Sequence, residues 1–64
     1  MFKVTITTTE GLVIPAFIKP REMASIEDNK LFHYYTLNEE FDIESHYMRG
    51  SRVHSLDIIE GVAA

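Results

Sequence analysis

From Phe2 to Thr7 apolar and polar side chains alternate, and this alternation constrains the fold more than any other feature. Phe2, Val4 and Ile6 are each separated by a lysine or threonine. A period of two gives an extended strand one apolar and one polar face, and β-branched residues favour a half-buried sheet. A second apolar run, at residues 12–18, follows Glu10 and Gly11 directly. The pattern predicts a β-hairpin over residues 2–18.

Strand pairing determines the length of the first turn, because a slip of one residue would exchange the buried and exposed faces. A three-residue loop with a left-handed Gly11 places Val4 opposite Ala16 and Ile6 opposite Ile14. That register gives one continuous apolar face. A two-residue loop would leave Ile14 among the threonines, so the three-residue loop is predicted.

Three further strands are predicted, at residues 30–37, 41–48 and 53–60. Gly50 and Ser51 fit a two-residue hairpin between the last two strands, with Gly50 at positive φ. This register pairs Ile43 with Ile58 on an inner face. On the outer face it pairs Glu44 with Asp57, and two like charges directly opposite each other destabilise a sheet.

Residues 20–30 interrupt the alternation. Pro20 can begin a short helix, in which Met23 and Ile26 would cover an open end of the sheet; a plain loop is the alternative. Pro15 lacks an amide hydrogen, so the second strand should have one unpaired side, as an edge strand does. Residues 61–64 are predicted to fray.

These elements predict a single small domain over residues 1–64. The fold class is all-β, or β-dominated α+β if residues 20–30 form a true helix packed on the sheet. Five short strands with one long connection suit a five-stranded antiparallel curled sheet, or a small SH3-like partly open barrel. Both forms reduce the exposure of strand edges.

Composition argues against several classes of functional site and partner. The chain has no cysteine, which excludes disulfides, thiolate zinc sites and cysteine nucleophiles and fits a reducing compartment. No signal peptide or membrane-spanning stretch is recognisable, and we expect a cytoplasmic protein. The formal net charge of −4 argues against nucleic acid as a partner, because that affinity comes chiefly from neutralising phosphates. Another protein is the expected partner.

Only one group of side chains resembles a chemical site. Asp42, Glu44 and His46 share one face of a predicted strand, with Asp57 across the hairpin. Carboxylates and imidazole can bind a divalent cation, but no recognised ligand spacing is matched. A solvated acidic face is therefore preferred, and no metal or other cofactor is expected.

Catalytic groups are not expected either. His33, His46 and His54 lie on different strands, and alternation places His54 on the face opposite Ser55. A catalytic triad is excluded on that geometry. The glycines lie singly, so there is no phosphate-binding loop. The sequence predicts a protein that is not an enzyme.

Candidate contact residues are of three kinds. Phe32 and Tyr34 form either an exposed aromatic contact surface or a core beneath residues 20–30. Basic residues at Lys19, Arg21, Arg49 and Arg52 could join aromatics in holding single-stranded nucleic acid, although ordinary turn charges are preferred. An acidic cluster could imitate phosphates. The predicted partner-binding residues are Phe32, Tyr34, Glu39, Glu40, Asp42, Glu44, Arg49 and Arg52.

We therefore expect a small acidic, non-enzymatic binding module that docks on another protein and modulates or inhibits it. The alternatives are a structural homo-oligomer assembled through edge strands and a small barrel that binds single-stranded nucleic acid. In size and composition the chain is similar to the compact proteins that phages and other mobile elements encode.

Overall fold

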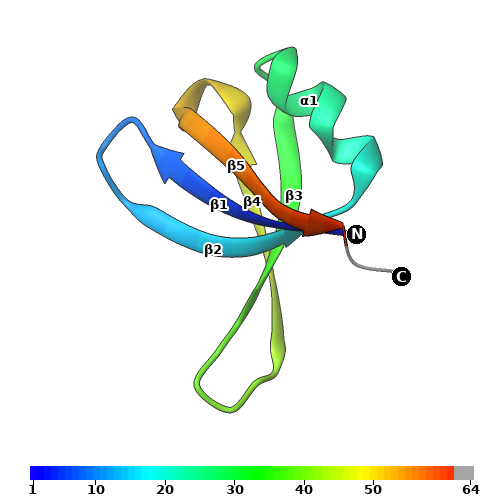
Figure 1. Ribbon diagram of the computed structural model, residues 1–64. Coiled ribbons are helices and arrows are strands. Elements are labelled where there is room, and N and C mark those ends of the chain that lie inside the picture. Colours follow the sequence, from blue (N-terminus) through cyan, green and yellow to red (C-terminus); the bar gives the residue numbers. More distant parts are fainter. Residues whose placement is uncertain (62–64) are drawn as a thin grey trace.

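The computed structural model describes residues 1–61 and consists mainly of five strands (Figure 1). They form one antiparallel sheet in the order β4-β3-β2-β1-β5, which curls without closing. The predicted β-dominated class is confirmed, in its open-sheet form. The strands are β1 (Phe2–Thr8), β2 (Val13–Ile18), β3 (Leu31–Leu37), β4 (Ile43–Arg49) and β5 (Val53–Gly61). Residues 62–64, part of the predicted fraying end, lie outside the described residues.

The β1–β2 hairpin has the predicted register. Val4 lies opposite Ala16 and Ile6 opposite Ile14. The turn is the three-residue loop, with Gly11 in the left-handed region at φ +88°. The amide of Gly11 donates to the carbonyl of Thr8 at 3.0 Å, which closes the turn. Local alternation and one glycine were sufficient to predict this half of the sheet.

Residues 20–27 form a helical segment, so the loop alternative is wrong. A 3-10 turn at Pro20–Glu22 leads directly into α1 (Met23–Glu27). Proline begins the turn because its fixed φ suits a first helical position and its missing amide hydrogen costs nothing there. Met23 and Ile26 pack against the core from one end of the sheet. This helical segment covers one face of β3 (Figure 1).

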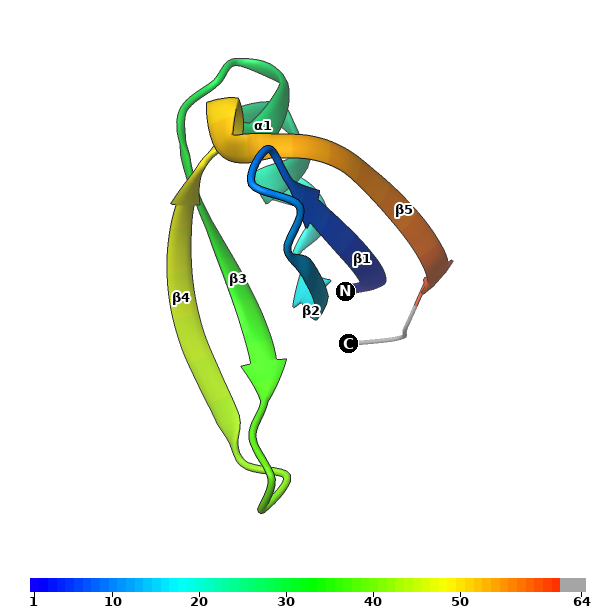
Figure 2. The same cartoon turned by 90° about the vertical axis from the view of Figure 1, so that its left-hand side faces the viewer.

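The predicted hairpin at Gly50 and Ser51 is wrong. A 3-10 turn at Gly50–Arg52 separates β4 from β5, which are the two edges of the sheet, and β5 pairs with β1 instead. Figure 2 shows β5 running beside β1, away from β4. A Cβ atom on Gly50 would lie 2.4 Å from the carbonyl oxygen of Ile26. Glycine is required here because the backbone of α1 approaches closely, and not for positive φ.

This topology removes the predicted clash of like charges. Glu44 lies opposite Thr36 on β3, whereas Asp57 lies opposite Thr5 on β1. Likewise Ile43 pairs with Leu37 and not with Ile58. The repulsion between Glu44 and Asp57 in the predicted register was therefore a sign that the register itself was wrong.

Alternation along the strands defines two faces of the sheet. The inner face holds the hydrophobic core beneath α1. Its buried members are Val4, Ile6, Ala16, Ile18, Phe32, Tyr34 and Met48. The outer face carries the intervening residues of each strand.

The sheet is weakest between β2 and β3. Their ladder consists of the single pair Phe17 and Tyr35. Pro15, two residues earlier, has no amide hydrogen to donate, so β2 has an unpaired stretch although it is not an edge strand. The far end of the β3–β4 hairpin extends beyond the rest of the sheet (Figures 1 and 2). At this projecting end of the hairpin the side chains of Leu37 and Ile43 are exposed.

Candidate functional site

Phe32 and Tyr34 are core residues and do not form an exposed contact surface. Their side chains are 1% and 7% exposed, and their rings lie 5.8 Å apart. Of the two predicted alternatives, the core beneath the helical segment is the one observed. The reason is tertiary: α1 and Met48 cover this face of β3, so the opposite face is the one left to solvent.

The outer face of β3 and β4 is unusually apolar for a surface. Ile43 is 71% exposed, Tyr47 65% and Leu31 56%. His33 lies between two tyrosine rings, 4.7 Å from Tyr47 and 4.5 Å from Tyr35. Its Nε2 atom is buried and has no hydrogen-bond partner within residues 1–61. The aromatic side chains are thus held in place by stacking against their neighbours.

Beside this cluster the outer face is hollowed. A depression of about 240 Å³, which we call the apolar groove, has only apolar and aromatic side chains around it. It lies where β2 and β3 diverge and where the pair Leu37 and Ile43 projects past β2. The groove is lined by Met1, Phe17, Tyr35, Leu37 and Ile43.

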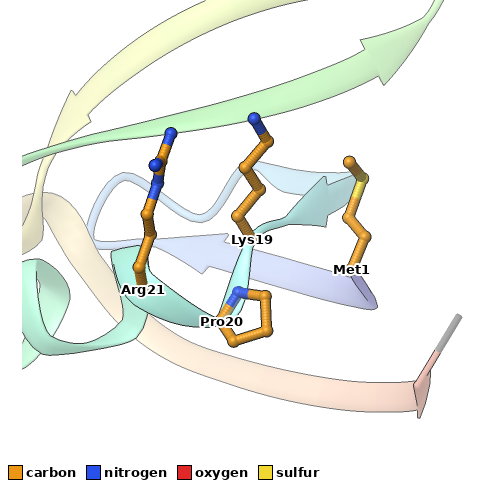
Figure 3. Close-up of a pocket in the computed structure, with 4 residues that line it drawn as sticks. All are labelled: Met1, Lys19, Pro20 and Arg21. Carbon is orange, nitrogen blue, oxygen red and sulfur yellow. The ribbon is translucent and has the colours of Figure 1, made fainter. Parts of the chain in front are cut away.

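Two further depressions adjoin the apolar groove. One, of about 290 Å³, we call the basic hollow; its lining is Met1, Lys19, Pro20 and Arg21 (Figure 3). Met1 lines both, so the two are neighbours. The other, of about 230 Å³, shares Phe17 and Leu37 with the groove and adds Lys3. The apolar groove is therefore flanked by cationic side chains.

The basic hollow has a defined geometry. Figure 3 shows the side chains of Lys19 and Arg21 running in the same direction, toward β3. The Nζ atom of Lys19 lies 5.8 Å from the centre of the Tyr35 ring, a cation–π distance. Neither cation has a carboxylate partner within residues 1–61. Both charges remain available to an incoming anion.

The predicted acidic residues gather at the tip of the β3–β4 hairpin. Glu39, Glu40 and Asp42 are exposed in the loop, and Glu44 is exposed one residue into β4. The side-chain oxygen of Asn38 organises this tip by accepting from the amides of Glu40 at 2.8 Å and Asp42 at 3.0 Å. Glu39, Glu40 and Asp42 thus share one exposed loop that leads directly into Ile43, whereas Glu44 projects to the face opposite Ile43.

Phe41, at the same tip, is both strained and exposed. Its φ is 64°, in the left-handed region, and its side chain is 81% exposed. A bulky residue rarely adopts this conformation. A ring that stays exposed gains little stabilisation from burial on folding, so nothing in the folding of the isolated chain favours phenylalanine here.

Arg49 and Arg52 are not part of the acidic tip. Arg49 ends β4, and that seven-residue strand separates it from the tip by about 20 Å. Arg52 forms an exposed ion pair with Glu10 of the β1–β2 turn. Of the eight predicted contact residues, the structure thus groups four acidic ones, buries two aromatic ones and places both arginines elsewhere.

The candidate cation site is not assembled. Asp57 lies on β5, and three strands, β1, β2 and β3, separate it from β4, which carries Glu44 and His46. Within residues 1–61 no group of three or more histidine and acidic side chains is close enough to hold a metal ion. The predicted group depended on the wrong β4–β5 pairing.

His46 instead contacts its neighbours on β3. Its Nε2 atom lies 2.9 Å from Thr36 Oγ1, and its ring stacks on Tyr34 with centres 5.2 Å apart. A hydroxyl beside an imidazole resembles part of a triad, but no carboxylate in the described part of the chain hydrogen-bonds to the ring. We interpret the contact as a cross-strand hydrogen bond that stabilises the β3–β4 hairpin.

The sequence prediction missed the groove, although a signal for it was present. Residues 31–37 carry bulky side chains on both faces, and Phe41, Ile43 and Tyr47 share one face of the next segment. In a small domain only one face can be covered. Apolar residues on both faces of a strand therefore indicated that one set would remain at the surface.

Comparison of the chain with known protein families, curated proteins and solved structures finds no match. None of the helices within residues 1–61 has the length and apolar character needed to cross a membrane.

Proposed function

We propose that this protein is a non-enzymatic binding module that docks on another protein through the apolar groove and modulates or inhibits it. The observation that carries the proposal is the groove itself, a hollow on the outer face whose lining is entirely apolar and aromatic. Exposed apolar patches on small proteins mark interaction sites when a polar rim surrounds them. Here the rim consists of the basic hollow and the acidic tip.

The energetic argument concerns the residues that a partner would cover. Ile43 and Leu37 are 71% and 48% exposed and form a cross-strand pair, so a partner can bury both together. Each square ångström of apolar surface removed from water contributes about 25 cal/mol. Tyr35 and Phe17, which are half-buried and held by the sheet, lose little side-chain freedom on binding. Such pre-positioned aromatic side chains are typical of interface centres.

A comparison of two matched variants tests the proposal. Tagged wild-type protein should recover one dominant partner from a lysate of the organism that encodes it. Ile43→Ser, in the groove, should reduce that recovery at least tenfold. The control is Ile59→Ser, which changes the same residue type at 57% exposure on the opposite edge strand. The control should bind like wild type, and circular dichroism should show that both variants fold.

Two outcomes would contradict the proposal. Recovery of nothing above background would argue against docking on a protein. Equal loss of the partner in Ile43→Ser and Ile59→Ser would show that the groove is not the contact surface.

A structural homo-oligomer is the second candidate, and one observation favours it. Both edge strands, β4 and β5, are unpaired along their outer sides within the described chain. Such edges can pair between copies. Light scattering at tens of micromolar protein distinguishes the two functions. A monomer would exclude the homo-oligomer hypothesis, and a closed oligomer would support it.

We place the protein in the cytoplasm, since a chain without cysteine suits a reducing compartment. A phage or mobile-element origin is proposed on size and composition alone. Fractionation of cells that express the tagged protein tests the location, and recovery in an oxidising compartment would contradict it.

A further inference from the structure

Resting on the proposed function, we infer that the docked partner segment is an apolar peptide with carboxylates at one end, which pair with Lys19 and Arg21 in the basic hollow. The apolar part of the segment covers the apolar groove. The inference names the chemistry of the partner, which the proposed function leaves open.

Proximity of the apolar groove and the basic hollow is the first argument. Met1 lines both the apolar groove and the basic hollow. Tyr35 lines the groove and also lies beneath the ammonium group of Lys19, at 5.8 Å. A peptide that covers Tyr35 therefore comes close to the ammonium group of Lys19.

Charge complementarity is the second argument. Lys19 and Arg21 run in the same direction and lack carboxylate partners within residues 1–61 (Figure 3). By contrast, Arg52 is neutralised by Glu10. The chain has a net charge of −4, so two unneutralised cations side by side are not what its composition favours. A planar guanidinium binds a carboxylate in a bidentate manner, which makes Arg21 a suitable anion ligand.

The acidic tip fixes the direction of the bound segment. Glu39, Glu40 and Asp42 lie next to Ile43, at the end of the groove opposite the basic hollow. Carboxylates placed at that end would be repelled, whereas carboxylates placed at Lys19 and Arg21 are attracted. The two ends of the groove thus select one orientation.

Single-stranded nucleic acid is the other ligand that aromatic and basic side chains can hold. It requires cations along the whole path of the backbone. Here the path from the basic hollow leads toward an acidic tip, and the net charge is negative. The observations therefore favour an acidic peptide, and nucleic acid becomes an outcome of the test.

The test is a selection of random twelve-residue peptides displayed on phage against the immobilised full-length protein. We expect the selected peptides to combine apolar residues with aspartate or glutamate at one end. The leading peptide, made synthetically, should bind Lys19→Glu/Arg21→Glu at least tenfold more weakly than wild type. The matched control is Lys30→Glu/Arg49→Glu, which changes the net charge equally at exposed residues outside the three hollows. That control should change affinity less than twofold.

A second measurement tests directly whether the carboxylates of the peptide pair with Lys19 and Arg21. Replacing the carboxylates of the peptide with amides should weaken its binding to wild type about tenfold, and should not weaken its binding to Lys19→Glu/Arg21→Glu. A double-mutant cycle built with Lys19→Gln/Arg21→Gln, which removes the two charges without introducing repulsion, isolates the pairwise contact.

The possible failures are distinguishable. Selected peptides that are apolar but not acidic, and that lose affinity with Ile43→Ser, would overturn the inference and leave the proposed function standing. A selection without enrichment would contradict both. Salt-dependent binding of a twelve-nucleotide oligothymidylate that is lost in Lys19→Glu/Arg21→Glu would assign the hollow to nucleic acid. A dimer in light scattering that Ile43→Ser dissociates would assign the groove to a second copy of the chain.

Discussion

The two hairpin turns of this protein have the same backbone hydrogen bonds but different residues at the critical position. In the β1–β2 turn, Thr8 donates its amide to the carbonyl of Leu12 at 2.9 Å, and Gly11 donates to Thr8 at 3.0 Å. In the β3–β4 turn, Asn38 donates to Asp42 and Phe41 donates to Asn38, both at 3.0 Å. The fourth residue of each turn is left-handed, at φ +88° for Gly11 and 64° for Phe41.

Glycine adopts this conformation without a steric cost, whereas a phenylalanine in it is strained. The first turn therefore has the residue that folding favours. The second has a residue that folding disfavours, and its side chain is 81% exposed. Backbone strain that the fold does not need is most readily explained by a function. The β1–β2 turn thus has the residue that suits stability, and we propose that the strained residue of the β3–β4 tip contacts the partner.

The largest effect should come from making the first turn resemble the second. Gly11→Phe should lower the free energy of unfolding by about 1 to 2 kcal/mol, because a side chain at positive φ clashes with its own backbone. No heavy atom lies within 4 Å of a Cβ placed on Gly11, so the loss reports the backbone alone. Thermal or urea unfolding measures it. Gly11→Asn is the control and should lose less, since asparagine tolerates this region; equal stability of Gly11→Phe and wild type would refute the strain argument.

The reverse substitution should stabilise the protein. Phe41→Gly removes the strain and should raise the free energy of unfolding by about 1 kcal/mol, after part of the gain is offset by the flexibility of glycine in the unfolded chain. In a domain of this size that corresponds to about 4–8 °C in the melting temperature. Recovery of the partner should fall at the same time. A loss of stability would show that Phe41 serves the fold, and unchanged recovery would show that Phe41 does not contact the partner.

The side-chain oxygen of Asn38, in the β3–β4 turn, should contribute somewhat less to the free energy of unfolding. Asn38→Ala removes the oxygen that accepts from the amides of Glu40 and Asp42. We expect a loss of about 0.5 to 1 kcal/mol in a urea unfolding experiment, typical of a partly solvated hydrogen bond. Asn38→Asp retains an acceptor oxygen and should recover part of the stability. If both variants lost the same amount, the acceptor would not be the cause.

The smallest effect should come from the ion pair that joins the first turn to the Gly50–Arg52 turn. Glu10 and Arg52 are 59% and 53% exposed, so Glu10→Gln should change the free energy of unfolding by less than about 0.5 kcal/mol. The difference between the variant and wild type should vanish in 1 M salt, where exposed charges are screened within about 3 Å. A larger or salt-independent change would mean that the pair fixes the turn through packing.

Predictability differed between the two halves of the sheet for a physical reason. The β1–β2 hairpin depends on alternation and on one turn glycine, both of which act between residues close in sequence. The pairing of β5 with β1 joins residues about fifty positions apart, and local patterns do not encode such pairing. Gly50 illustrates the difficulty: a glycine signals either positive φ or a close approach, and only the position of Ile26 decides between them.

The candidate site, too, was predictable only where it depends on residues close in sequence. The acidic residues at the hairpin tip were predicted as a surface, since a charged run between two strands is exposed in almost any fold. The groove was not predicted, because its formation depends on which face of β3 the helical segment covers. The alternation of residues 31–37 is compatible with burial of either face of the strand, because both faces carry bulky side chains.

The sequence by itself determined that the chain is a β protein and where its strands and its first turn lie. The tertiary structure decided that β4 and β5 are separate edges and that Phe32 and Tyr34 are buried while Tyr35, Leu37 and Ile43 line a groove. The reason is that a period of two specifies two faces for every strand, whereas only packing against the rest of the chain specifies which face is turned to water.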